Sequence, residues 1–339
     1  MIPQPSSGEI AHPYRKGHSI VKKLRIGISA CLLGQEVRFD GSHKRDRFLT
    51  EAFADYAEWV SVCPELEMGL GVPRPTLRLE KDGDQTRLIM PKTGEDYSEQ
   101  MATFAEERVD RLTALKLDGY VLKSRSPSCG MERVKIYPHA GSSGSFASKG
   151  VGHFAAVLMK CLPNLPVEEE GRMHDPPLRE NFVSRLFAYQ RWQALVANGV
   201  TRAALTTFHA AHKYQMMAHN QTRLRNAGRL LANPDAFASD DELATAYLAE
   251  FTQIMQRAPS PRNHSNALQH MVGYFTKELD AQDTAEMTQA IDDYRLGLLP
   301  LIVPITLIRH YVRKFDVTYL QDQVYLFPHP HELMLLNRL

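Results

Sequence analysis

Hydrophobic positions in the first half of the chain alternate between two spacings. Short apolar, β-branched runs are typical of buried strands. They begin at Lys23 (KLRIGISACLL), Trp59 (WVSVCPE) and Gly119 (GYVL). Between them, residues 45–58 and 96–117 carry apolar side chains at helical spacing. Strands that alternate with helices predict a mostly parallel sheet with right-handed crossovers. We therefore expect an α/β domain with a Rossmann-like parallel sheet over residues 24–165.

The second half of the chain shows 3.6-residue periodicity and few strand signals, so we expect an all-α domain over residues 179–339. CLPNLPVEEEGRMHDPPL, residues 161–178, contains four prolines and an acidic run. This composition is typical of a linker, which we place at residues 166–178. The Gly/Ser-rich residues 141–150 predict a mobile loop, and the polar residues 1–23 predict a flexible tail.

Composition narrows the class of protein. A content of 43% hydrophobic and 23% charged residues is ordinary for a globular protein, and the net charge of +1 excludes a bulk polycation. The tail lacks the apolar segment of a signal peptide. The longest apolar run, LGLLPLIVPITLI, is too short and too interrupted by proline to span a bilayer. We therefore expect a cytoplasmic protein without a membrane partner.

Four cysteines are too few for a disulfide scaffold and indicate metal binding or catalysis. Cys31 and Cys63 stand at the ends of predicted strands, and Cys129 lies in the loop after the third. Because the carboxyl ends of parallel strands share one edge, we expect these three thiols to converge. Three thiolates suit zinc or an iron–sulfur cluster, and the spacing favours neither. A buried apolar role for each cysteine and a catalytic thiol are the alternatives. We expect Cys161 in the core, at the surface, or as a fourth ligand.

The loops beside the cysteines carry further polar groups. Residues 126–130, SPSCG, form turns that leave backbone N–H groups outward, and Glu65 follows Cys63 by two residues. Arg38 and Asp40 follow Cys31 closely, so we expect them, with Ser128, to bind substrate. Glu65 can alternatively balance a helix dipole.

SACLLGQEVRFDG, VSVCPELEMGLGVPRP and LKSRSPSCG together resemble the thiouracil desulfidase family over residues 24–162. The resemblance implies a [4Fe–4S] cluster on Cys31, Cys63 and Cys129, with the fourth iron free to bind the sulfur of a thiolated pyrimidine. It also implies catalytic roles for Glu65 and Ser126, which would deprotonate or orient the water that attacks the ring carbon. Glu67-Met68-Gly69 departs from the small glycine pair usual in the family, which changes the pocket wall.

Basic residues in the helical half are segregated from acids. Residues 202–234, 251–277 and 294–315 contain no acid. Histidines at three- and four-residue steps share one helix face, which suits phosphate and ribose contacts in RNA. The predicted RNA-binding residues are His209, His212, Lys213, His219, Arg223, Arg313 and Lys314. A solvated or structural face and a histidine metal site are the alternatives.

FHAAHKYQMMAHN and HSNALQHMVGYF resemble the helical domain of unknown function that often follows a desulfidase domain. Such two-domain proteins resemble tRNA 4-thiouridine desulfidases. The resemblance implies an enzyme that converts 4-thiouridine in tRNA to uridine and hydrogen sulfide. Desulfuration of free thiouracil, with the helices serving oligomerisation, is one alternative. A non-catalytic RNA-binding protein with a structural or redox-sensing cluster is the other. A tRNA substrate requires that the two domains share one cleft.

Overall fold

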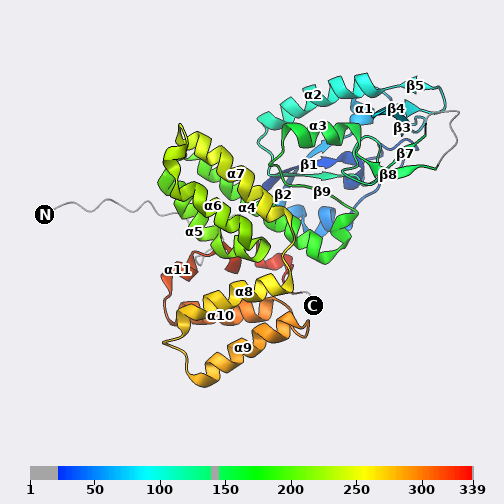
Figure 1. The fold of residues 1–339 in the computed structure, drawn as a ribbon. Coiled ribbons are helices and arrows are strands. Elements are labelled where there is room, and N and C mark those ends of the chain that lie inside the picture. The colour runs from blue at the N-terminus through cyan, green and yellow to red at the C-terminus, as the bar shows by residue number, and fades with distance from the viewer. Residues whose placement is uncertain (1–21, 139–144, 338–339) are drawn as a thin grey trace.

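The computed structural model describes residues 22–138 and 145–337 and shows an α/β part followed by an all-α part (Figure 1). The predicted fold class is confirmed. Nearly all of the predicted tail lies outside the described residues, as does the start of the predicted 141–150 loop. The end of that loop is instead a strand, β8 (Ala147–Gly150).

Sheet A is the parallel sheet that the apolar runs predict. Its strand order is β2-β1-β6-β9, and every neighbouring pair is parallel. The strands are β1 (Leu24–Ser29), β2 (Ala57–Val62), β6 (Gly119–Leu122) and β9 (Val167–Glu169). β1 and β6 are almost wholly buried, because helices and turns cover both faces of the sheet. The three predicted strands therefore lie side by side.

Helices and turns form the outer layers of sheet A. One face packs against α2 (Ser98–Ala114) and α3 (His153–Cys161), which lie together above the sheet in Figure 1. The other face packs against α4 (Pro176–Ala197) and two short turns. These turns, Phe48–Ala52 and Ala54–Tyr56, replace the single helix predicted over residues 45–58.

The predicted linker begins with a strand of sheet A. β9 pairs with β6, and its glutamates are buried. Their charges are matched locally, since Glu168 accepts hydrogen bonds from Arg172 and Arg185, and Glu169 accepts one from the N–H of Met131. Arg172 belongs to the same segment, whereas Arg185 and Met131 lie outside it. The acidic composition therefore suggests a linker although the fold pairs these glutamates.

A second sheet, sheet B, is absent from the sequence prediction. Its order is β5-β4-β3-β7-β8, and all neighbours are antiparallel except the parallel pair β3–β7. The remaining strands are β3 (Arg78–Asp82), β4 (Gln85–Met90), β5 (Glu95–Asp96) and β7 (Val134–Tyr137). Charged residues dominate β3 and β5, which weakens their β signal, and β7 is only four residues long.

The rest of the chain forms a helical bundle with its own core. Its helices are α5 (Arg202–His219), α6 (Gln221–Ala232), α7 (Asp240–Gln256), α8 (Pro261–Val272), α9 (Ala281–Arg295), α10 (Ile302–Lys314) and the short α11 (Thr318–Gln321). No helix in the described part of the chain is long and apolar enough to cross a membrane.

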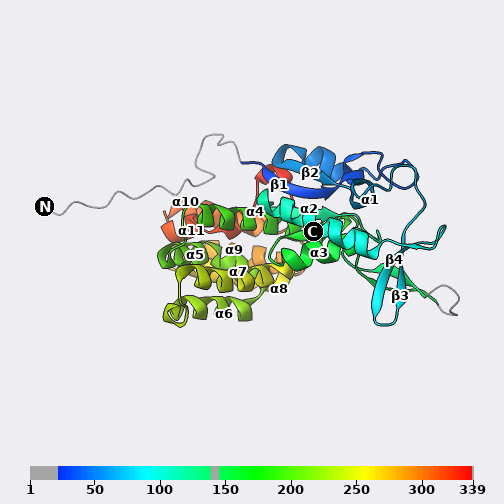
Figure 2. The same ribbon diagram turned by 90° about the horizontal axis from the view of Figure 1, so that it is seen from above.

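Helix α4 belongs to both cores. Phe182 and Leu186 pack on sheet A, whereas Ala188 and Trp192 pack in the helical bundle. Leu335, near the end of the chain, also packs in the core between sheet A and α4. Figure 2 shows this red segment close to β1 and β2. The two parts are therefore joined by packing as well as by sequence.

Candidate metal centre and active site

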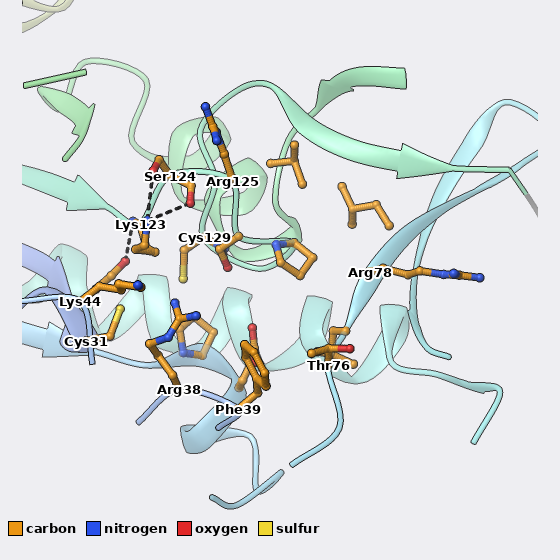
Figure 3. A pocket seen from close by; sticks show the side chains of 18 of the residues that line it. Cys31, Arg38, Phe39, Lys44, Thr76, Arg78, Lys123, Ser124, Arg125 and Cys129 are labelled. Carbon is orange, nitrogen blue, oxygen red and sulfur yellow. Dashed lines mark hydrogen bonds between the residues drawn. The ribbon is translucent and has the colours of Figure 1, made fainter. Parts of the chain in front are cut away.

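The three cysteines of the sequence prediction line one cavity of about 1400 Å³ at the carboxyl edge of sheet A. Cys31 lies in a 3-10 turn directly after β1, and this turn ends at Gly34 with a φ of 90°. Cys63 follows β2 and immediately precedes α1 (Pro64–Glu67). Cys129 lies in the loop after β6, and Figure 3 shows it facing the same space as Cys31. The strand ends thus bring together residues almost a hundred positions apart.

The three thiols are free and mostly buried. Burial raises the pKa of Cys31 to about 11, against the opposing effect of the Lys123 ammonium. Burial also raises the pKa of Cys63 and raises that of Cys129 well above the ordinary thiol value, and in Cys129 the other two cysteines add to the shift. The thiols are therefore poorly ionised by themselves, and a bound cation would stabilise their thiolate forms.

The donor chemistry fits a thiolate-bound metal centre, because three soft ligands face one cavity whose lining supplies compensating positive charge. Among the described residues, no three His, Cys, Asp or Glu side chains are grouped as ligands of a single ion. Cys161 is exposed and does not line the cavity, so the structure places it outside the group of three.

The loop that carries Cys129 is fixed at both ends. The Ser126 hydroxyl oxygen accepts hydrogen bonds from the N–H groups of Ser128 (3.2 Å) and Cys129 (3.1 Å). The loop also packs against the start of α3, where a Cβ on Gly152 would lie 2.5 Å from the Ser128 carbonyl oxygen. Cys129 is therefore held rigidly, and Ser126 has both a turn-forming role and a place on the cavity wall.

Glu65 lines the cavity and is held by two partners. Its Oε1 accepts a hydrogen bond from the Ser128 hydroxyl (2.8 Å), and its Oε2 accepts one from Arg74 Nε (2.9 Å) and forms an ion pair with Arg74 Nη2 at 2.8 Å. Arg74 also donates to the carbonyl oxygens of Gly71 and Val37. Arg74 is not among the residues predicted from the sequence, because a lone arginine in a proline-containing turn gives no distinct signal.

The predicted substrate-binding residues divide into three cases. Arg38 lines the cavity, as expected of a residue that contacts substrate. Ser128 is fully buried and holds Glu65 from behind, so the prediction of direct substrate contact is wrong for it. Asp40 is not part of the cavity wall. It accepts hydrogen bonds from Ser42, which lower its pKa, and pairs with Arg38 at 3.7 Å.

Positive charge dominates the cavity wall. Nine lysines and arginines line it against three glutamates. The cations are Arg38, Lys44, Arg74, Arg78, Lys123, Arg125, Arg133, Lys135 and Arg172. Lys123 is hydrogen-bonded to Glu170 and to Ser124, and Figure 3 shows Lys123 and Ser124 at the same end of the pocket as Cys31. Such a wall favours an anionic ligand over a neutral one.

The predicted histidine stripe on α5 faces inward. His212 and His219 are buried and bond backbone carbonyl oxygens through Nδ1, so their predicted contact with RNA is wrong. Burial lowers the pKa of His212 to about 3 and that of His219 to about 4. The predicted helix periodicity is correct, but the stripe packs in the core. His209 is half-buried and hydrogen-bonds Tyr247.

The other predicted RNA-binding residues lie at or near the surface. Arg313 and Lys314 are exposed at the end of α10. Lys213 is half-buried beside the Tyr214 ring, and Arg223 pairs with Glu250 at 2.9 Å. In the described part of the chain, no residue after Arg172 lines the cavity. The helical domain therefore does not form a wall of the cysteine cavity.

Fold and site together define a class of α/β protein in which three strand-end thiols face one cavity. Residues 26–170 match the family described as 2-thiouracil desulfurase, and residues 213–330 match a family of unknown function, DUF1722. The chain therefore belongs to the 2-thiouracil desulfurase family in its first half and to the DUF1722 family in its helical part.

Two relatives and one solved structure are similar to parts of the chain. "Uncharacterized protein YbgA" of Escherichia coli strain K12 is 30% identical over 141 residues, which are 42% of this chain and 83% of YbgA. "Uncharacterized protein YbbK" of Bacillus subtilis strain 168 is 30% identical over 141 residues, 39% of this chain and 88% of YbbK. The solved structure of the "[4Fe-4S]-dependent thiouracil desulfidase TudS" is 30% identical, with a TM-score of 0.37, over 45% of this chain and 95% of that one.

Proposed function

We propose that this protein is an iron–sulfur-dependent desulfidase that removes sulfur from 4-thiouridine in tRNA, giving uridine and hydrogen sulfide. The observation that carries the proposal is the convergence of Cys31, Cys63 and Cys129 on one cationic cavity. The 2-thiouracil desulfurase family supports a thiolated pyrimidine as the reacting group. A tRNA substrate accords with the cytoplasmic location that the sequence predicts.

The three cysteines would hold a [4Fe–4S] cluster through their thiolates. Such a cluster, with one iron open, supplies a Lewis acid that can accept the thiocarbonyl sulfur. Lys123 stands next to Cys31 and offsets negative charge at this end of the cavity. The sulfur of the substrate must therefore point toward the cysteine end, with the rest of the nucleotide toward the cationic walls.

Glu65 is the group that would take a proton from the attacking water. Its Oε1 and Oε2 each accept hydrogen bonds in the structure, and carboxylate oxygens can accept more than one. Arg74 on Oε2 and the Ser128 hydroxyl on Oε1 together fix the direction of the carboxylate, which is a requirement for a general base. Ser126 uses its oxygen to accept N–H bonds, so its hydroxyl hydrogen can be donated to the water or to the exocyclic oxygen that replaces the sulfur.

The cationic wall favours a nucleotide substrate over a free base. Thiouracil is uncharged, whereas each nucleotide of an RNA brings a phosphate that lysines or arginines of the cavity wall can contact. No described residue of the helical domain lines the cavity, so the expectation that both domains line one cleft is not met, and exposed Arg313 and Lys314 would bind the RNA outside the cavity. Free thiouracil is the second candidate substrate, favoured by the family description and by the substrate that the name of TudS states.

Protein purified without oxygen tests the proposal. Iron and sulfide content are measured first, and the loaded protein is then mixed with tRNA containing 4-thiouridine and, separately, with 2-thiouracil. We expect hydrogen sulfide and loss of 4-thiouridine from digested tRNA. Loaded protein that releases no sulfide from either substrate would contradict the desulfidase proposal, and release from 2-thiouracil alone would favour the second candidate.

A further inference from the structure

Sheet B contributes buried and cavity-facing side chains to the wall of the cysteine cavity. Leu79 and Val134 are buried in the core beneath α2 and α3, and both also line the cavity. Because successive side chains in a strand point to opposite faces, their neighbours in sequence point the other way. Arg78, Lys135 and Tyr137 accordingly line the cavity. This wall of the site thus comes from a sheet that the sequence did not predict.

Two aromatic rings lie next to each other on this wall. The register of β7 and β8 pairs Ile136 with Ala147, so Tyr137 and Phe146 stand opposite each other. Their ring centroids are 5.8 Å apart and their planes are inclined by 47°. Phe146 is 44% exposed although it lines the cavity. Part of its ring surface is therefore open to a ligand.

A cation accompanies each ring. The Lys135 ammonium lies 4.3 Å from the Phe146 centroid, and the Arg78 guanidinium lies 5.1 Å from that of Tyr137. Glu80 hydrogen-bonds Arg78 at 2.8 Å and holds it in place. Within the described residues, no carboxylate forms an ion pair with Lys135. Its charge is thus available for a ligand phosphate.

This wall is separated from the cysteines by the width of the site. Figure 3 shows Arg78 at one end of the pocket and Cys31 and Cys129 toward the other, with Thr76 on the same side as Arg78. A single pyrimidine is too small to occupy both ends of a cavity of about 1400 Å³. Aromatic rings interleaved with cations are the chemistry of sites for single-stranded nucleic acid.

We propose that Phe146, Tyr137 and Lys135 form a subsite for the nucleotide next to the thiolated one in an unstacked RNA strand. Phe146 stacks on the neighbouring base, and Lys135 contacts a phosphate. The catalytic purpose of this subsite rests on the proposed desulfidase function, but its binding of RNA is measurable without catalysis. It also assigns recognition of the flanking base to the N-terminal domain.

The test uses full-length, cluster-loaded protein and a fluorescent five-nucleotide RNA with a central uridine, which is not consumed. Two further oligomers carry an abasic position immediately 5′ or 3′ of that uridine. Loss of a stacked base weakens nucleic-acid binding by roughly 5- to 150-fold. We expect Phe146→Ala to raise the dissociation constant by this range on the intact oligomer and to change it little on one abasic oligomer. Phe146→Tyr should bind like wild type.

Two further variants sharpen the test. Lys135→Gln should lower the slope of log Kd against log salt by about one, as expected for one lost phosphate contact. Leu298→Ala alters another exposed apolar side chain, which lies outside the cavity wall, and should leave both affinity and slope unchanged.

Equal weakening of all three oligomers by Phe146→Ala would overturn the subsite, because a merely structural role does not depend on the neighbouring base. Unchanged affinity for the intact oligomer would also overturn it. The same five-nucleotide RNA with a central 4-thiouridine separates this subsite from the proposed catalysis. If binding depends on the neighbouring base but the loaded protein releases no sulfide from this RNA, the subsite stands and the proposed desulfidase activity on 4-thiouridine fails.

Discussion

The Arg74–Glu65 pair offers the sharpest test of how the active carboxylate is held. Arg74→Met removes a guanidinium whose side chain is only 3% exposed and leaves Glu65, 14% exposed, without its cationic partner. Removing one partner of a buried ion pair costs about 3–5 kcal/mol, because the remaining charge is uncompensated. We therefore expect this loss in the free energy of unfolding, measured by urea denaturation with an unchanged m value.

Arg108→Met is the matched control. Arg108 forms an ion pair at 2.8 Å with Glu67, which lies on the same short helix α1 as Glu65. Both side chains of this pair are more exposed, Arg108 at 19% and Glu67 at 32%. Solvent screens such a pair, so its loss should cost about 1 kcal/mol or less. If Arg74→Met and Arg108→Met destabilise the protein equally, burial does not govern the strength of these pairs.

A double variant shows whether the unpaired charge of Glu65 causes the loss of stability. Glu65→Gln in the Arg74→Met background removes the unpaired charge, so the double variant should be more stable than Arg74→Met alone. Additive losses from the two substitutions would refute the reasoning, because they would mean that the charges do not interact. Desulfidase activity should fall in both variants, since each disturbs the carboxylate that the proposed function uses as a base.

Three more changes have defined outcomes. Cys129→Ser should lower the iron content of anaerobically purified protein, whereas Cys161→Ser should leave it unchanged, because Cys161 does not line the cavity. Gly152→Ala should also lower the iron content and cost about 1–3 kcal/mol of stability in urea, because its Cβ would collide with the backbone of Ser128. His212 has a pKa lowered to about 3 by burial, so below about pH 6.5 the unfolded chain binds a proton that the folded chain does not. The free energy of unfolding should therefore decrease as the pH is lowered. His212→Phe should remove about 2 kcal/mol of the decrease that urea denaturation measures between pH 7 and pH 5.

Controls for these changes lie in the same chain. Gly273→Ala places a Cβ where no atom lies within 4 Å and should leave iron content unchanged. If Cys129→Ser and the wild-type protein contain equal amounts of iron, Cys129 is not a ligand of the metal centre. A pH dependence that His212→Phe leaves intact would show that another group controls stability in acid.

The convergence of the three cysteines could be predicted from the sequence, because the inference depends only on where the strands end. Apolar runs before Cys31, Cys63 and Cys129 are strong local signals, and the parallel order of the sheet brings the ends together. Sheet B was missed because β3 and β5 are rich in charged residues and β3 pairs with a distant segment, β7. β9 was missed because its glutamates are paired only once α4 brings Arg185 beside them. Arg74 was missed for the same reason, since its partner Glu65 comes from another segment.

The histidine stripe of α5 shows a different limit. Spacing correctly grouped His212 and His219 on one helix face, but spacing does not say whether that face meets water or a neighbouring helix. Backbone carbonyl oxygens of Phe208 and Arg257 accept the ring hydrogen bonds and make burial possible. Polarity by itself therefore misplaced these two residues on an RNA surface.

Helix α4 affects how the protein can be divided. A chain cut at the predicted linker would strip Phe182 and Leu186 from sheet A and expose an apolar flank that would favour aggregation. A chain that began after the linker would keep α4 but leave its sheet-facing side bare. Limited proteolysis should therefore release neither half intact, and heating should unfold both in one cooperative transition. We therefore expect the two families to be fused here into a single unit of stability. A substitution that destabilises the helical bundle should then also weaken metal binding by the cysteines.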